Sequence, residues 1–171
     1  MSRPTIALAS DHRGYALKGV LRSELESAGY GVLDLGTDSD EAVDYPDYGY
    51  TAAQAIAGGR AARAVVICGT GIGICIAANR HPAVRAAVCH EPEAARLARR
   101  HNDLNVLALA SNDLDENAAK EILRIFLETE FEGGRHQARV AKLGAPEIES
   151  PSLPGTGPRS APLRAAAGSS K

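Results

Sequence analysis

Short apolar runs alternate with longer amphipathic stretches along the first 128 residues, and this rhythm restricts the fold more than any other feature. The predicted strands span 5–10, 30–36, 62–68, 84–89 and 105–110, and the predicted helices span 14–29, 48–58, 72–79, 92–101 and 114–128. Strands that alternate with helices are joined by right-handed crossovers, which place helices on both faces of a parallel sheet. The sequence therefore predicts a three-layer α/β/α, Rossmann-like domain with a mostly parallel five-stranded sheet. Its ligand site is expected beyond the carboxyl ends of the strands.

The C-terminal part of the chain departs from this alternation. Residues 133–149 predict a terminal basic helix that docks against the domain or against a partner subunit. Residues 150–171 contain four of the nine prolines and few large apolar side chains, a composition typical of a disordered tail. We therefore expect one domain over 1–149, followed by a tail without chemistry.

Composition excludes several classes of function. A net charge of -2 gives no general attraction to nucleic acid or to anionic membranes, and the absence of tryptophan disfavours a stacking platform for single strands. No apolar run approaches the roughly 20 residues that span a bilayer. The three cysteines form no CxxC pair, and their odd number argues against a disulfide framework. We expect a cytoplasmic protein with free thiols and with neither nucleic acid nor membrane as a partner.

A glycine-rich stretch, CGTGIGICIAANR (68–80), follows a predicted buried strand and opens a predicted helix. Glycines at 69, 71 and 73 let the backbone approach a ligand closely, and the start of the helix turns unpaired N–H groups toward it. The loop is expected to bind negative charge, either a phosphate or an oxyanion that develops during a reaction. Its GxGxG spacing is neither the dinucleotide-binding GxGxxG nor a Walker A sequence. Ile74 stands where a cysteine-dependent phosphatase needs an arginine.

Cys68 stands at the entrance of this loop, and two interpretations of it are open. It could be a small buried residue that ends a strand, since free cysteine is often buried. A thiol beside a helix N-terminus and an anion-stabilising loop is instead favoured as the thiolate, which serves as a base or a nucleophile.

Further polar motifs lie next to the predicted strands and helices: SDHRG (10–14), DYPDY (44–48), HND (101–103) and GRHQAR (134–139). Arg135 and Arg139 share a helix face and could clamp a phosphate, or they could form a solvated surface. Asp11 could cap the following helix. His101 lies at the C-terminus of its predicted helix, where a positive charge would interact favourably with the helix dipole, and that alone could explain it.

Two further histidines, His81 and His90, belong to no constellation. No spacing typical of a metal site occurs in the sequence, so we expect neither a metal nor a cofactor.

Together these motifs resemble the type B ribose-5-phosphate isomerases, a family that also includes galactose-6-phosphate isomerase subunits. The resemblance runs in order from about residue 5 to 145. It implies an enzyme that interconverts D-ribose 5-phosphate and D-ribulose 5-phosphate through an enediolate, without metal or cofactor. It also implies a homodimer, or a dimer of dimers, in which the neighbouring subunit completes each active site.

The resemblance also implies roles for individual residues. Cys68 would remove the C2 proton, Thr70 and the loop amides would stabilise the oxyanion, and His101, assisted by Asp11, would open the furanose ring. Asn102 would bind a substrate oxygen, Tyr45 would line the sugar pocket, and His12, Arg135 and Arg139 would hold the phosphate. The implied substrate-binding set is Asp11, His12, Tyr45, Gly69, Thr70, Gly71, Ile72, Gly73, Asn102, Arg135 and Arg139.

Three positions sharpen or limit this assignment. Some relatives use a glutamate six residues after the cysteine position, but Ile74 occupies that place here, so Cys68 is the only candidate base in the loop. Cys75 is expected to be a core thiol. Many members carry a phosphate-binding arginine where this chain has Asn112. Other phosphosugars, such as allose or galactose 6-phosphate or erythrulose 4-phosphate, therefore stay open as substrates, as does a non-catalytic phosphosugar-binding role.

Overall fold

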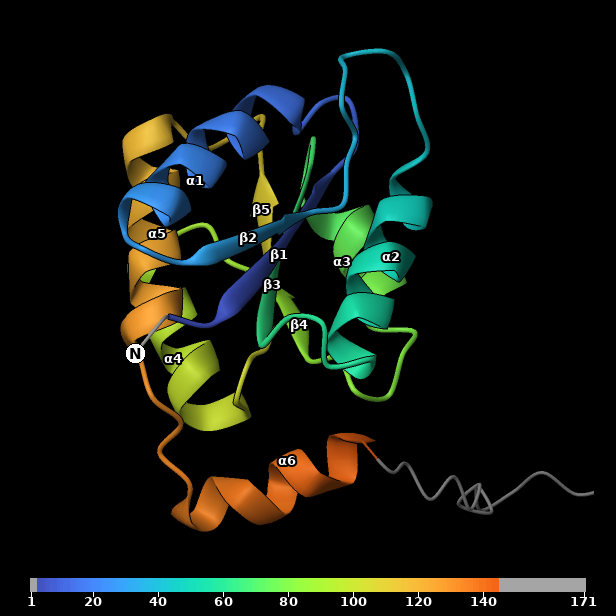
Figure 1. Cartoon of the computed structure of the whole chain (residues 1–171). Helices are drawn as coiled ribbons and strands as arrows, with labels where there is room; N and C mark the ends of the chain where they lie inside the picture. The colour runs from blue at the N-terminus through green and yellow to red at the C-terminus, as the bar shows by residue number, and fades with distance from the viewer. Residues whose placement is uncertain (1–2, 145–171) are drawn as a thin grey trace, which may run out of the picture.

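Five parallel strands form one sheet at the centre of the molecule, seen in a computed structural model that describes residues 3–144 (Figure 1). The strands are β1 (Thr5–Ser10), β2 (Gly31–Asp34), β3 (Arg63–Cys68), β4 (Ala86–Val88) and β5 (Val106–Ala110). Their spatial order is β2-β1-β3-β5-β4, and all four pairings are parallel. The predicted α/β class is confirmed, and the sheet is parallel throughout.

Helices cover both faces of this sheet. One face carries α1 (Tyr15–Ser27), α4 (Pro92–Asn102) and α5 (Glu116–Glu128), and the other carries α2 (Tyr45–Ala57) and α3 (Ile72–Ala78) (Figure 1). Leucine, isoleucine and phenylalanine side chains fill the first core, whereas the second is built largely from alanine and valine. Small side chains let α2 and α3 approach closely, because a Cβ on Gly49 would lie 2.7 Å from the Cβ of Ala77.

Several boundaries differ from the predicted ones: β2 spans Gly31–Asp34 rather than 30–36, and α1 spans Tyr15–Ser27 rather than 14–29. Three other differences have a clear local reason. Helix α2 begins at Tyr45 rather than at 48, because Pro46 lies in the first turn, where a missing N–H costs nothing. Strand β4 is three residues long rather than six, and the amide N–H groups of Arg85 and Ala86 donate to the side chains of Asn105 and Asn79.

The terminal helix also begins later than predicted. Gly133 and Gly134 adopt positive φ angles of 66° and 55°, so a 3-10 turn, η1 (Gly134–His136), precedes α6 (Gln137–Gly144). Residues 145–149 of that predicted helix and the predicted tail over 150–171 lie outside the described residues.

The order of the strands fixes where a site can form. From β1 the chain runs to β2 on one side, then crosses to β3 on the other, so α1 and α2 lie on opposite faces. The two crossovers part at the carboxyl ends of β1 and β3, the place where open α/β sheets bind ligands. Ser10 pairs with Ile67 at this point, which brings Asp11 and Cys68 to the same edge. Across residues 3–144, no helix has the length and apolar character needed to cross a membrane.

Candidate active site

Cys68 is the last residue of β3, and its side chain lies in the core between the sheet and helices α2 and α3. Only 4% of the residue is exposed. Its carbonyl oxygen accepts hydrogen bonds from the N–H of Ser111 (3.0 Å) and from the Ser111 hydroxyl (3.2 Å). These bonds tie the end of β3 to the end of β5, so the thiol has a fixed position at the entrance of the glycine-rich loop.

The loop itself, residues 69–73, presents backbone donors next to that thiol. Within the described part of the chain, the N–H groups of Gly69, Thr70 and Gly71 have no hydrogen-bond acceptor. The Thr70 Oγ1 accepts from the N–H of Ile72 (3.3 Å), which leaves the hydroxyl proton of Thr70 available as a donor. The loop can therefore receive an oxyanion at the carboxyl edge.

Gly71 sets the shape of this loop. Its φ of 72° lies in the left-handed region, and an added Cβ would lie 3.0 Å from the carbonyl carbon of Leu109 and from Cγ1 of Val88. A side chain at this position would therefore strain the backbone and would also press against the backbone of β5.

We expect Gly71→Ala to lower the free energy of unfolding by about 1–2 kcal/mol, the typical cost of a left-handed residue that carries a Cβ. Because the loop amides would shift with it, turnover should fall as well. Urea denaturation together with kinetics checks both effects. Gly19→Ala, in the exposed and open part of α1, is the matched control. Equal stability and turnover in Gly71→Ala and the parent would contradict this account of the loop.

Asp11 follows β1 directly and is 4% exposed. Its Oδ1 accepts from the N–H groups of Arg13 (3.0 Å) and Gly14 (3.1 Å), so it organises the turn that opens α1. This oxygen therefore binds the turn before α1, close to the capping role considered for Asp11, although the N-cap residue of α1 is Gly14. The other oxygen, Oδ2, has no hydrogen bond within residues 3–144 and is available to a ligand.

His12 and Tyr45 line the same edge. Nδ1 of His12 lies 3.2 Å from both the N–H nitrogen and the carbonyl oxygen of Val43, so the loop after β2 orients the ring in either tautomer. The ring of Tyr45 packs on Gly73, where an added Cβ would lie only 2.6 Å from ring atom Cε2. The structure therefore brings Asp11, His12, Tyr45 and Cys68 to one edge, as predicted.

A second group of predicted residues lies elsewhere. His101 and Asn102 end α4, and Arg135 and Arg139 lie on η1 and α6. The ring of His101 stacks on His136 with centroids 4.5 Å apart and planes 9° from parallel. Burial, followed by the neighbouring charges of His101 and Arg135, lowers the pKa of His136.

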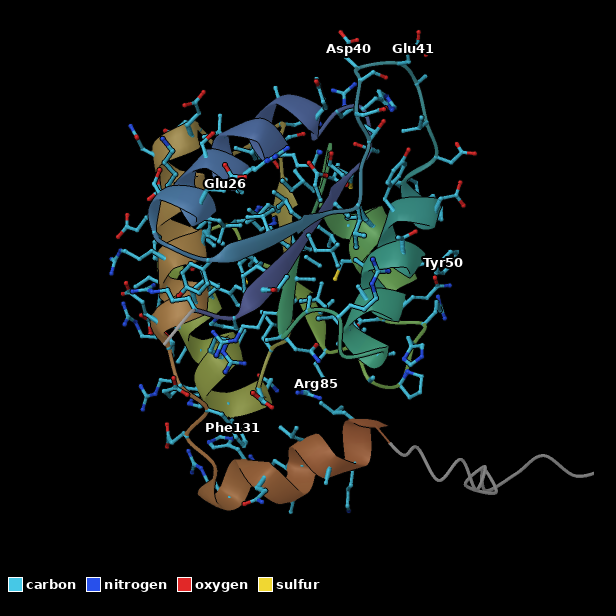
Figure 2. All side chains as sticks on the ribbon, in the orientation of Figure 1. Glu26, Asp40, Glu41, Tyr50, Arg85 and Phe131 are labelled. Atoms are coloured by element: carbon cyan, nitrogen blue, oxygen red, sulfur yellow. The ribbon has the colours of Figure 1, made fainter. Side chains whose placement is uncertain are left out.

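The two groups occupy opposite edges of the sheet. Helix α4 leads into the start of β5. There Val106 pairs with Ala64, which lies near the start of β3 and four residues before Cys68. At about 3.3 Å per residue, those four steps separate the groups by about 13 Å along the strands alone. Figure 2 shows the same arrangement: Asp40 and Glu41, in the loop that orients His12, lie at one end, and Phe131, beside the segment leading to α6, lies at the other. A single chain does not bring all the predicted site residues together.

The other two cysteines differ from Cys68 in their surroundings. Burial, and then the neighbouring Cys68, raises the pKa of Cys75, and burial raises the pKa of Cys89 to about 11. Both thiols therefore favour the protonated form near neutral pH. Cys75 is buried in the core on the α2 and α3 side of the sheet, as predicted for a core thiol. In residues 3–144, no group of three or more His, Cys, Asp and Glu side chains is arranged to hold a metal ion.

The largest of the cavities described, about 730 Å³, lies beside this edge rather than in it. It opens between α1 and the loop after β2, and an ion pair of 2.6 Å between Lys18 and Asp34 lines it. It includes neither Cys68 nor any residue of the glycine-rich loop. We place the site at the thiol, because the donors and the acid–base groups converge there.

One residue at the carboxyl edge has no role in the sequence-based assignment. The Nη2 of Arg13 donates to Oδ1 of Asn112 across 2.9 Å, over the glycine-rich loop. Arg13 lies within SDHRG, directly after the first predicted strand, and this position was the sequence signal that could have placed it at the carboxyl edge.

A doubly wound α/β fold with a buried thiol at its switch point, beside a loop whose N–H donors have no acceptor within residues 3–144, is typical of enzymes that act on small molecules. The chain belongs to the Ribose/Galactose Isomerase family, whose model matches residues 6–143, and it is a sugar-phosphate isomerase. It is 46% identical to "Ribose-5-phosphate isomerase B" of Escherichia coli over 142 residues, which cover 83% of this chain and 95% of that one.

Two further relatives bear on the fold and on the substrate. The structure of Ribose-5-Phosphate Isomerase B from Clostridium thermocellum aligns with a TM-score of 0.81 and 48% identity, covering 82% of this chain and 95% of that chain. "D-erythrulose-4-phosphate isomerase" of Pectobacterium atrosepticum is 40% identical over 141 residues, covering 82% of this chain and 93% of the relative.

Proposed function

We propose that this enzyme interconverts D-ribose 5-phosphate and D-ribulose 5-phosphate. The observation that carries the proposal is the position of Cys68, fixed at the end of β3 beside N–H groups that have no acceptor within the described residues. The relatives named ribose-5-phosphate isomerase B support the choice of substrate. Erythrulose 4-phosphate is the main alternative, because a relative with that name is nearly as similar.

In the proposed reaction, the enzyme moves one proton between neighbouring carbons. His101, assisted by Asp11, transfers a proton to the ring oxygen while the hydroxyl on C1 loses its proton, so the bond between C1 and the ring oxygen breaks and the furanose opens to the aldehyde. The Cys68 thiolate then takes the proton from C2, and the electron pair forms the enediolate. The loop N–H groups and the Thr70 hydroxyl stabilise its negative oxygen. Return of the proton to C1, with transfer of a proton from O2 to O1, gives the ketose.

The proposed active site needs a second copy of the chain. His101, Asn102, Arg135 and Arg139 would come from the partner subunit, since within one chain they lie at the edge opposite Cys68. An apolar surface suited to such a partner flanks the loop, because Ile72 and Ile76 on α3 are 55% and 51% exposed. Helix α6 has no buried residue within its own chain, as expected for an element that packs on a neighbour.

The test of the function is an isomerisation assay over aldose and ketose phosphates of four, five and six carbons, with and without a chelator. We expect the highest kcat/KM with ribose 5-phosphate, no loss on chelation and no release of inorganic phosphate. A preference for the four-carbon pair would replace the proposed substrate. Binding of every compound without turnover would favour the phosphosugar-binding alternative.

A further inference from the structure

The side chain of Arg13 crosses the carboxyl edge of the sheet from β1 to β5. It starts in the turn whose N–H groups bind Asp11. Its Nε and Cδ atoms lie 3.0 and 3.1 Å from the position that a Cβ on Gly69 would occupy, and its Nη2 donates to Asn112 Oδ1 (2.9 Å). The guanidinium thus lies over the first residue of the glycine-rich loop, next to Cys68.

This guanidinium carries a charge that no carboxylate neutralises within residues 3–144. The arginines on α1, α4 and α5 that form ion pairs have Asp or Glu oxygens within 4.0 Å, whereas Arg13 has none among the residues that the structure describes. The nearest carboxylate in sequence, Asp11, directs its Oδ1 to backbone N–H groups instead. A guanidinium has five N–H donors. Among the described residues only one donor of Arg13 is engaged, by a neutral amide that orients it without cancelling its charge.

We propose that Arg13 binds the phosphate group of the substrate and that Asn112 positions its guanidinium for this contact. The inference rests on the proposed function and adds a specificity-determining residue to it. A guanidinium offers paired donors that match two phosphate oxygens, and the dianion supplies the countercharge that the site lacks. The enediolate oxygen is served separately by the N–H groups of the loop. Asn112 stands where the family resemblance predicts an arginine, so the cation reaches this edge from β1 rather than from β5.

The direct test is Arg13→Gln, which removes the charge from an exposed side chain and keeps a polar group that can form hydrogen bonds. We expect the KM for ribose 5-phosphate to rise by about 10- to 100-fold, the usual range for a lost charge-assisted hydrogen bond, with kcat changed much less. The inhibition constant of inorganic phosphate should rise in parallel. Arg124→Gln, which breaks an exposed ion pair with Glu128 on α5, is the matched control and should leave both constants unchanged. Unchanged constants in Arg13→Gln would overturn the proposal.

Two changes at position 112 test the positioning role. Asn112→Asp supplies a carboxylate beside Arg13, so the two should pair and the KM should rise without any loss of the arginine. In the Arg13→Gln background, Asn112→Arg should lower the KM again by returning a cation to the same point. A double variant as weak as Arg13→Gln, or an Asn112→Asp variant equal to the parent, would contradict the assignment.

Thermal protection separates this proposal from the proposed reaction. Inorganic phosphate should raise the melting temperature of the parent enzyme and of Arg124→Gln, but much less that of Arg13→Gln. If the parent showed this protection and yet did not isomerise ribose 5-phosphate, the assigned reaction would fail and the role of Arg13 would stand. Equal protection of the parent and Arg13→Gln would refute the role of Arg13, whatever the turnover.

Discussion

Replacing Cys68 by alanine is expected to reduce kcat for ribose 5-phosphate by about 100- to 10,000-fold, the range that a positioned general base contributes. Binding should persist, because the loop N–H groups and the phosphate-binding side chains remain in place. The change removes one buried sulfur atom from a side chain whose backbone is held by Ser111, so the fold should be preserved. Turnover kinetics and calorimetric titration with ribose 5-phosphate measure the two effects separately.

Cys75→Ala is the matched control for this experiment. It deletes a thiol of the same core, but burial raises the pKa of Cys75, so this thiol stays protonated and plays no part in proton transfer. We expect a small loss of stability and a kcat close to that of the parent. Near-normal turnover in Cys68→Ala would refute the assignment of Cys68 as the base.

A second readout follows the proton itself. In D2O, the parent should place deuterium on the product carbon, because a thiol exchanges its proton with solvent. Cys68→Ala should show no such incorporation into bound substrate. This measurement identifies the base even if product release limits kcat in the parent.

The fold could be predicted from the sequence because its pattern is local. Each buried strand is a short apolar run, and each helix repeats apolar residues every three or four positions, as Leu17, Leu21 and Leu25 do in α1. Three of the boundary errors fall where local backbone chemistry decides: the proline at the start of α2, the two glycines before η1, and the side-chain amides that replace ladder bonds beside β4. None of these alters the periodic pattern on which the prediction rests.

The candidate site was predictable only in part, for a reason of distance along the chain. Residues such as Asp11 and Cys68 directly follow strands, and parallel strands end at one edge, so their proximity follows from topology. His101 ends a helix that leads to the opposite edge, and the sequence contains no signal that separates contacts within a chain from contacts between chains. The contact of Arg13 with Asn112 joins positions 99 residues apart, which no motif spacing reveals.

Mixing two inactive variants is expected to restore activity if the sites are shared between subunits. In a hybrid dimer of Cys68→Ala and His101→Ala, one site combines Cys68 of the second chain with His101 of the first, so both groups are intact there. The other site lacks both groups. If subunits exchange at random, half of the dimers are hybrids, and each hybrid has one working site of two. The mixture should therefore reach about one quarter of the parent activity. Each variant alone should be almost inactive.

The control for this complementation pairs two variants whose changed residues, Asp11 and Cys68, come from the same chain in each active site. Asp11→Asn keeps the Oδ1 acceptor for the turn into α1 but removes the carboxylate beside Cys68. In its hybrid with Cys68→Ala, each site takes Asp11 and Cys68 from a single chain, so every site has one defect and the mixture should stay inactive. Recovery in the first mixture alone places His101 across the interface from Cys68. Inactivity of both mixtures, with subunit exchange verified by two affinity tags, would require His101 and Cys68 to act within one chain. That result would contradict their separation at opposite edges of the sheet.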